Sequence, residues 1–298
     1  MSGVRSRMGA AGLLLPLLLS GCLVSRRKLP VPKAPEIVQS ASPADLVARL
    51  NKQWNAVQSL NATVEMKATV IKSAQGVSSE YPSIRGIILL RKPDMLRVFG
   101  RYPVVGTRMF DMISDGKTFT LWIRTPLMDE AIEGPVTESK TKSTNQFENL
   151  RPGFFFDAMV VHGLSFDDEY YVTADTDTME DTAKKHLYLM PEYLLNIVRR
   201  MPGSHELAPA RVVHFHRDDL LPYQQDLYDA EGNLQTQITY GRYVDFGPVR
   251  YPSTITIKRP LDGLKLVLTI EKVAENTALT DEEFHFTLPP GTDVKKLP

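Results

Sequence analysis

The sequence of 298 residues contains one cysteine, carries no net charge, and has a single long hydrophobic run, at its start. One cysteine excludes an intramolecular disulfide. Lys and Arg (35) balance Asp and Glu (35), which argues against nucleic acid as a partner, because binding to phosphates depends on clustered basic charge. The sequence also lacks a glycine-rich phosphate loop and a recognisable Ser-His-Asp arrangement. It therefore does not predict an enzyme or a cofactor site.

The hydrophobic run has the layout of a secretory signal. Arg5 and Arg7 precede an apolar core from Ala10 to Leu19, and the small residues Ser20 and Gly21 follow. A transmembrane helix needs about 20 apolar residues, so this core is too short to span a bilayer, and no later segment is longer. We interpret the run as a cleaved signal of an exported protein.

The four residues Leu19-Ser20-Gly21-Cys22 resemble the bacterial lipobox. The resemblance implies that residues 1–21 are a lipoprotein signal peptide and that Cys22 becomes the lipidated first residue, which leaves no thiol for zinc binding or nucleophilic catalysis. Two or three acyl chains would make a stable anchor. An ordinary signal peptide cut elsewhere, with an incidental cysteine, is the alternative.

The residues after Cys22 indicate the destination and a spacer. In bacteria that sort lipoproteins, the residue after the lipidated cysteine helps to decide the destination, and aspartate there is the retention signal of enteric species. Leu23 stands here, so the resemblance favours the outer membrane, with the protein facing the periplasm. Pro30, Pro32 and Pro35 indicate a semi-extended tether over residues 22–41. We expect one domain over residues 42–298.

The first part of this domain predicts a helix followed by strands. Ser42 is a helix cap before Pro43, and one apolar stripe follows at helical spacing: Leu46, Leu50, Trp54, Val57 and Leu60. The segment NATVEMKATV then alternates apolar and polar residues, as a half-buried strand does. Further alternating runs and turn signals predict an antiparallel meander, interrupted by a mobile loop near GPVTESKTKSTNQFENL and a short helix within RPGFFFDAMVVHGL.

A run near the middle of the chain resembles a known family. Residues 83–126 look like the core of the LolA/LolB superfamily of periplasmic lipoprotein carriers and outer-membrane acceptors: a glycine at Gly86, a basic residue before Pro93, and the Ser114-Asp115-Gly116 turn leading into Phe119. The C-terminal LTDEEFHFTLPPGTDVKKLP also fits the family's closing strand. Order and spacing carry this resemblance, and residues 133–207 are longer than in the family.

The resemblance implies a mainly β (α+β) fold, an incomplete antiparallel β-barrel with a few helices packed in its concave mouth. Its apolar cavity would bind acyl chains and would be lined by Val64, Met66, Ile84, Ile88, Leu90, Leu96, Val98, Phe119 and Leu121. In the carrier an arginine before the proline helps to hold the lid closed. Arg91 and Lys92 occupy that place here, and lysine lacks the planar fork of arginine.

The implied function is the binding of acyl chains of lipoproteins or lipids by a protein that its lipidated Cys22 holds in the membrane. A periplasmic lipoprotein carrier is a further expected partner. The alternative is a structural or sensory envelope lipoprotein that uses the same fold as a protein-interaction surface. The sequence pattern leaves open whether the apolar face encloses a cavity or is filled by its helices.

Two polar clusters have some, but not all, of the features of a metal site. His214 and His216 share one face of a predicted strand and could hold a metal if a carboxylate joined them; without a third fixed ligand, we favour imidazoles on the solvent face. Asp175, Asp177, Glu180 and Asp181 lack the spacing of an EF-hand. We expect a solvated acidic loop there, and no metal.

Overall fold

The computed structural model describes residues 38–72, 77–102, 106–125, 128–137, 150–181 and 186–297. Its helices are α1 (Pro43–Ala56) and α2 (Pro152–Met159), with short 3-10 helices η4 (Pro260–Asp262) and η5 (Asp281–Phe284). The strands are β1 (Ser59–Lys72), β2 (Val77–Glu80), β3 (Ile84–Arg91), β4 (Met95–Arg101), β5 (Arg108–Ser114), β6 (Thr118–Thr125), β7 (Met128–Pro135), β8 (Glu169–Asp181), β9 (His186–Arg200), β10 (Leu207–His216), β11 (Pro222–Tyr228), β12 (Leu234–Tyr240), β13 (Tyr243–Phe246), β14 (Val249–Pro252), β15 (Thr254–Arg259), β16 (Leu264–Glu275) and β17 (Asp293–Lys296).

The main element is a 15-stranded sheet in the order β17-β7-β6-β5-β4-β3-β1-β16-β15-β12-β11-β10-β9-β8, with β2 beside β1. Neighbouring strands are antiparallel, except that β17 pairs parallel with β7. The sheet curves without closing, and β8 and β17 form its two ends. The predicted mainly β fold, an incomplete barrel with helices on its concave face, is confirmed.

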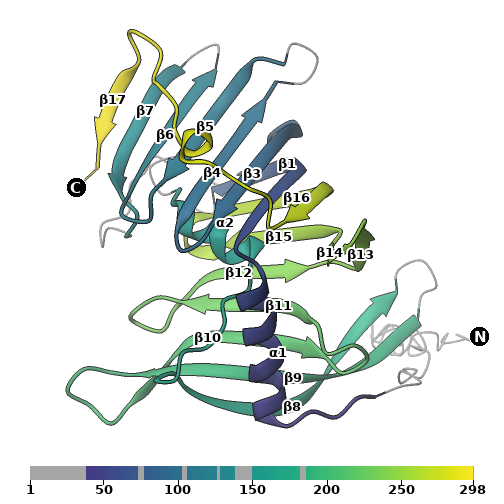
Figure 1. Cartoon of the computed structure of the whole chain (residues 1–298). Coiled ribbons are helices and arrows are strands. Elements are labelled where there is room, and N and C mark those ends of the chain that lie inside the picture. The colour runs from purple at the N-terminus through teal and green to yellow at the C-terminus, as the bar shows by residue number, and fades with distance from the viewer. Residues whose placement is uncertain are drawn as a thin grey trace, which may run out of the picture.

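Helix α1 begins as its sequence predicts. The Ser42 hydroxyl accepts a hydrogen bond from the Asp45 amide (3.2 Å), and the Asp45 carboxylate accepts one from the Ser42 amide (3.0 Å), which is a capping box. Leu46 and Leu50 are fully buried against β9 and β10, together with Leu195 and Phe215. Figure 1 shows α1 lying across strands β8 to β11.

The largest core cluster lies on the concave face around β1, β3, β4 and β6 and includes the side chains of α2. Alternation in β1 explains this face: Ala62, Val64 and Met66 are buried, whereas the intervening Glu65 and Lys67 are exposed.

The C-terminal segment crosses the convex face of the same half of the sheet (Figure 1). Leu279 and Phe284 pack on Leu89 there, and the buried Arg97 guanidinium donates to the carbonyls of Glu283 (2.8 Å) and His285 (3.2 Å). The segment ends as β17 beside β7. One half of the sheet is thus covered on both faces.

Two sequence predictions on local structure have different outcomes. The short helix predicted within residues 151–164 is confirmed as α2. The prediction of a loop at Asp175 and Asp177 is wrong, because both residues lie in strand β8 and pair with β9. Its β-branched and aromatic neighbours, including Tyr171, Val172 and Thr173, favour a strand. Most of the predicted mobile loop, residues 138–149, lies outside the described residues.

Candidate functional site

The structure brings all nine predicted cavity residues onto the concave face. Ile88 of β3 lies opposite Ala62 of β1 and Val98 of β4, and the alternation of each strand places the remaining residues beside them. Eight of the nine are buried to 3% exposure or less, and Ile84 is partly buried against the same cluster. The register therefore assembles one continuous apolar wall from β1, β3, β4 and β6.

Side chains of the protein itself cover this wall. Helix α2 contributes Phe154, Phe155 and Phe156, and each is at most 6% exposed. Two side chains hold the helix by its carbonyl groups: the Tyr251 hydroxyl donates to Met159, and Gln225 Nε2 donates to Asp157 (3.1 Å). The predicted lining residues are thus in contact with an internal apolar plug.

A pocket of about 140 Å³ lies at the margin of this plug. It is formed between α2 and the turns that join β3 to β4 and β5 to β6, and its walls are Asp94, Leu96, Ser114, Gly116, Val136, Pro152, Gly153, Phe156, Asp157 and His162. Leu96 belongs to the predicted cavity wall, so the pocket meets that wall at the mouth of the half-barrel. A second pocket, of about 260 Å³, lies on the polar side of α1 near Asp45 and Arg49.

Lys92 joins the mouth to the end of α1. Its ammonium donates to the Trp54 carbonyl and lies 3.3 Å from the centre of the indole ring. The Trp54 ring also stacks on His162 (centroids 4.3 Å apart, 24° between planes), and His162 Nε2 lies 3.0 Å from the Asp157 carboxylate. Burial lowers the pKa of Lys92 to about 8. Three segments therefore meet at Trp54: α1, the β3–β4 turn and the linker after α2.

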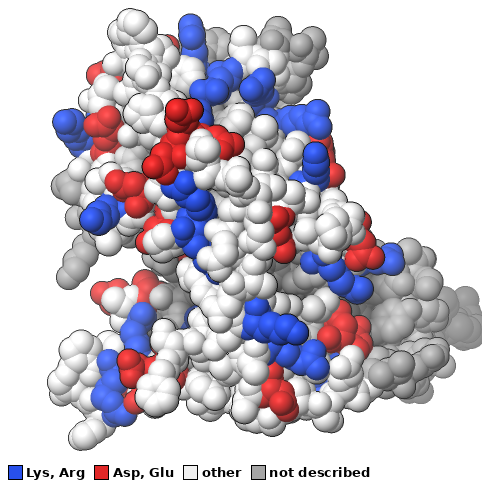
Figure 2. Space-filling model, viewed as in Figure 1, with Lys and Arg blue, Asp and Glu red and all other residues white. Residues whose placement is uncertain are grey.

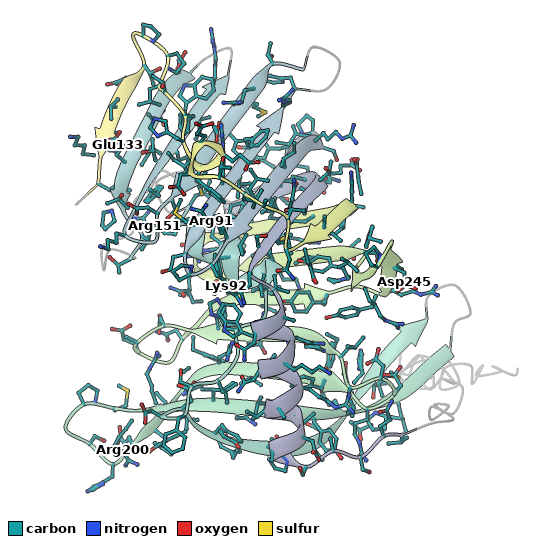
Figure 3. All side chains as sticks on the ribbon, viewed as in Figure 1. Arg91, Lys92, Glu133, Arg151, Arg200 and Asp245 are labelled. Atoms are coloured by element: carbon teal, nitrogen blue, oxygen red, sulfur yellow. The ribbon has the colours of Figure 1, made fainter. Side chains whose placement is uncertain are left out.

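Arg91, the other predicted lid-side residue, lies on the opposite face of the sheet. Odd-numbered residues of β3 point away from α2, so Arg91 donates to the Leu279 carbonyl (2.7 Å), pairs with Asp281 and lies 5.1 Å from the Phe284 ring. Figure 3 shows Lys92 near the end of α1 and Arg91 toward the C-terminal segment. Lys92 contacts a covering helix, whereas Arg91 fastens the C-terminal segment.

A polar network that sequence reasoning missed lies on the convex face of the other half. His214 of β10 sits between two carboxylates, Glu192 of β9 (3.3 Å) and Asp226 of β11 (3.0 Å), and the Tyr223 hydroxyl also binds Glu192. Burial alone would lower the pKa of His214, but the hydrogen bonds to Asp226 and Glu192 outweigh it and raise this pKa to about 9. The carboxylates are 22 and 12 positions away, so no short motif could have revealed them.

His216, its predicted companion, stacks on Tyr223 instead (centroids 3.8 Å apart, 6° between planes). Burial lowers the pKa of His216. Over the residues that the structure describes, no group of three or more His, Cys, Asp or Glu side chains could hold a metal ion.

The predicted anchor and its surroundings lie outside the described residues, because Cys22 and the tether up to residue 37 precede them. In the part of the chain that is described, neither the length nor the apolar character of any helix suffices to cross a membrane. Figure 2 shows basic and acidic side chains intermixed on the face in view, without a broad field of either sign.

Among known proteins, the chain shows similarity to solved structures at low sequence identity. No family model and no curated protein matches it. Among solved structures, a LolA superfamily protein from Nitrosomonas europaea has 13% identity and a TM-score of 0.48, over 83% of this chain and 99% of that chain. A DUF1329 family protein from Desulfovibrio piger has 14% identity and a TM-score of 0.48, over 82% and 95%.

A third structure, a domain from Vibrio parahaemolyticus described as an outer membrane lipoprotein-sorting protein, has 13% identity and a TM-score of 0.43, over 80% of this chain and 94% of that chain. One of these similar structures thus belongs to the LolA superfamily, the family that the sequence resembles. Because all three TM-scores are below 0.5, function has to be argued from the geometry of this chain itself.

Proposed function

We propose that this protein binds acyl chains of lipoproteins or lipids on the concave face of its half-barrel, without catalysis, while its lipidated Cys22 holds it at the outer membrane facing the periplasm. The observation that carries this proposal is the internal plug. Three consecutive phenylalanines, Phe154 to Phe156, occupy the apolar wall in the place where an acyl chain would lie.

An acyl chain can take the place of the three phenylalanines of α2 on the apolar wall. Helix α2 has eight residues, and its cap residue Arg151 makes no side-chain capping bond. A helix this short is unstable alone, so its position depends on the burial of its aromatic side chains and on the hydrogen bonds from Tyr251 and Gln225. Burying one such side chain contributes about 1.5–3 kcal/mol, whereas each buried methylene of an acyl chain contributes about 0.8 kcal/mol. A chain of roughly a dozen carbons therefore contributes about as much as the burial of three phenylalanines.

The mouth supplies a route for entry. The pocket between α2 and the β3–β4 turn exposes Phe156 of the plug and Leu96 of the wall to the same space. An acyl chain entering there would separate α2 from the sheet first at this margin. Lys92 and Trp54 flank this margin and tie it to α1, so α1 and α2 would respond together.

The test compares two phenylalanines of equal burial on opposite faces of the sheet. Phe155 lies in the plug, and Phe284 lies under the C-terminal segment; they are 5% and 6% exposed. Phe155→Ala should tighten the binding of a fluorescent fatty acid, because the shortened plug competes less well with the ligand, while Phe284→Ala should leave the Kd unchanged.

Both variants should lose stability by about 3–5 kcal/mol, so affinity, measured on folded protein, distinguishes them. Mass spectrometry of material extracted from the purified wild-type protein should detect acyl lipids. Absence of extracted lipid together with equal Kd values for both variants would refute the proposal and favour an envelope protein whose surface, not its concave face, is functional.

A further inference from the structure

Among the residues that the structure describes, one end of the sheet has an open edge. Strand β8 is the terminal strand, and it pairs with β9 without a register shift from Glu169 to Asp181. At the other end, the short β17 lies beside β7. The unpaired amides and carbonyls of an edge strand are a template for another strand, and proteins commonly block them.

Half of the β8 edge is blocked by its own side chains. The Thr176 amide donates to the Asp175 carboxylate (2.7 Å), and the Thr178 amide donates to the Asp177 carboxylate (2.8 Å). Amides point alternately to the two sides of a strand, so the even-numbered residues of β8 face the same side. On the unblocked half, these are Tyr170, Val172 and Ala174.

An exposed aromatic residue, Phe166, precedes this unblocked half in the chain. Phe166 is fully exposed on a tight turn, in which the Ser165 amide donates to the Asp168 carboxylate (2.7 Å). Asn51 fixes the preceding linker through two hydrogen bonds with Leu164 (2.7 and 3.2 Å). A backbone held in place before binding loses little conformational entropy on contact. The turn therefore presents Phe166 as an exposed apolar anchor, and Tyr170 and Tyr171 are also exposed.

The surrounding charge selects the kind of partner. Asp167, Asp168 and Glu169 follow Phe166 directly, and Asp175 ends the unblocked half; Arg200, at the tip of the β9–β10 hairpin in Figure 3, pairs with Glu169 (3.3 Å). This acidic rim disfavours an anionic lipid surface. A second copy paired about Val172 would set Glu169 against Asp175, and like charges directly opposite destabilise a strand pair.

We propose that an extended segment of a partner protein adds as a strand to Glu169–Asp175. The segment is apolar at alternate positions, so that its apolar face covers Phe166 and Tyr170, and it carries a basic residue at each end, opposite Glu169 and Asp175. Seven paired residues bury too little area for a stable dimer of globular chains, which needs about 1,200 Å² or more, but they suffice for a peptide that gains main-chain hydrogen bonds.

The experiment uses the exported chain with Cys22→Ser and a probe peptide of seven residues with blocked ends, alternating valine and threonine between two terminal lysines. Amide hydrogen exchange is measured by NMR. At saturation the exchange of Tyr170, Val172 and Ala174 should slow about tenfold or more, since these amides become hydrogen-bonded. Phe166→Ser should weaken the Kd about tenfold, as loss of an aromatic anchor does, and Leu261→Ser, which changes another exposed apolar side chain, should not.

Ala174→Pro removes one open amide and should abolish the slowing, with circular dichroism confirming the fold. As a second measurement independent of that fold, a probe N-methylated on its pairing edge should fail to bind wild-type protein. Unchanged exchange at the three amides would overturn the proposal. So would slowing that depends on protein concentration without peptide, which indicates a second copy, or Phe166-dependent binding to phosphatidylglycerol vesicles, which indicates a membrane contact.

Discussion

His214 should make the stability of this protein depend on pH in an unusual direction. Its side chain is 14% exposed and lies between Glu192 and Asp226. Because these carboxylates raise the pKa of His214 from 6.5 to about 9, the folded state holds a proton that the unfolded chain releases at lower pH. Its contribution is complete below pH 6.5 and is lost as the pH rises through 9.

The size of the effect follows from the two pKa values. A rise from 6.5 to about 9 corresponds to about 3 kcal/mol of stabilisation. Burial alone would raise the pKa of Glu192 and of Asp226, but their hydrogen bonds, first of all those with His214, outweigh it and lower both pKa values, so both carboxyl groups remain ionised in this window. Lys92 acts in the opposite direction, because its lowered pKa of about 8 makes stability rise with pH above 8.

Comparison of variants isolates His214 from Lys92. Urea unfolding is measured at pH 6, 7, 8 and 9 on wild type, His214→Gln and the control His205→Gln, whose histidine is exposed. The free-energy difference between wild type and His214→Gln should shrink by about 3 kcal/mol from pH 6 to pH 9, and the control should follow wild type. A difference that is constant across this range would refute the ion-paired, protonated state of His214.

Three further predictions concern the anchor, the first helix and the apolar wall. Cys22→Ser should leave the protein uncleaved or free in the periplasm, and fractionation with the outer membrane after normal processing would contradict lipidation. Trp54→Ala should lower the free energy of unfolding by about 3 kcal/mol. This is the low end for a large truncation, because the indole contacts Lys92, His162 and Phe156 but is partly exposed. An unchanged melting temperature would show that these contacts are unimportant. If the wall opens to a ligand, Ile88→Asn should abolish fatty-acid uptake while circular dichroism still shows a folded domain. Unfolding of the variant would indicate a permanently packed core. Uptake at the wild-type level would show that Ile88 is not part of the site.

The elements that sequence predicts well are those specified by neighbours in the chain. The Ser42–Asp45 capping box, the stripe with Leu46 and Leu50, and the alternation of β1 all depend on residues within a few positions, and each is found in the structure. The far end of the predicted stripe is wrong, because Val57 is the C-cap of α1 and Leu60 lies in β1. The common face of the nine wall residues follows from the same alternation. Their role as a ligand site stays a prediction.

Features that depend on distant residues could not be predicted. His214 has the sequence of a solvent-facing or metal-binding histidine until β9 and β11 bring Glu192 and Asp226 to it. Arg91 and Lys92 are adjacent in sequence but are separated by the sheet, because consecutive strand residues point to opposite faces and the C-terminal segment covers one of them. The filling of the wall by α2 depends on tertiary packing and not on helix propensity.

The pairing of β1 with β16 has a consequence for how the protein reaches its structure. The two halves of the sheet meet at this one ladder, where Thr63 lies opposite Lys272. Hairpins within each half are local and form early, but the central ladder closes a loop of nearly the whole described chain. Such contacts slow folding, because the entropy of closure is lost before their energy is gained. During synthesis β1 therefore stays unpaired on one side until β16, one of the last strands, is made. A chain of this topology needs protection from aggregation at β1 over that interval.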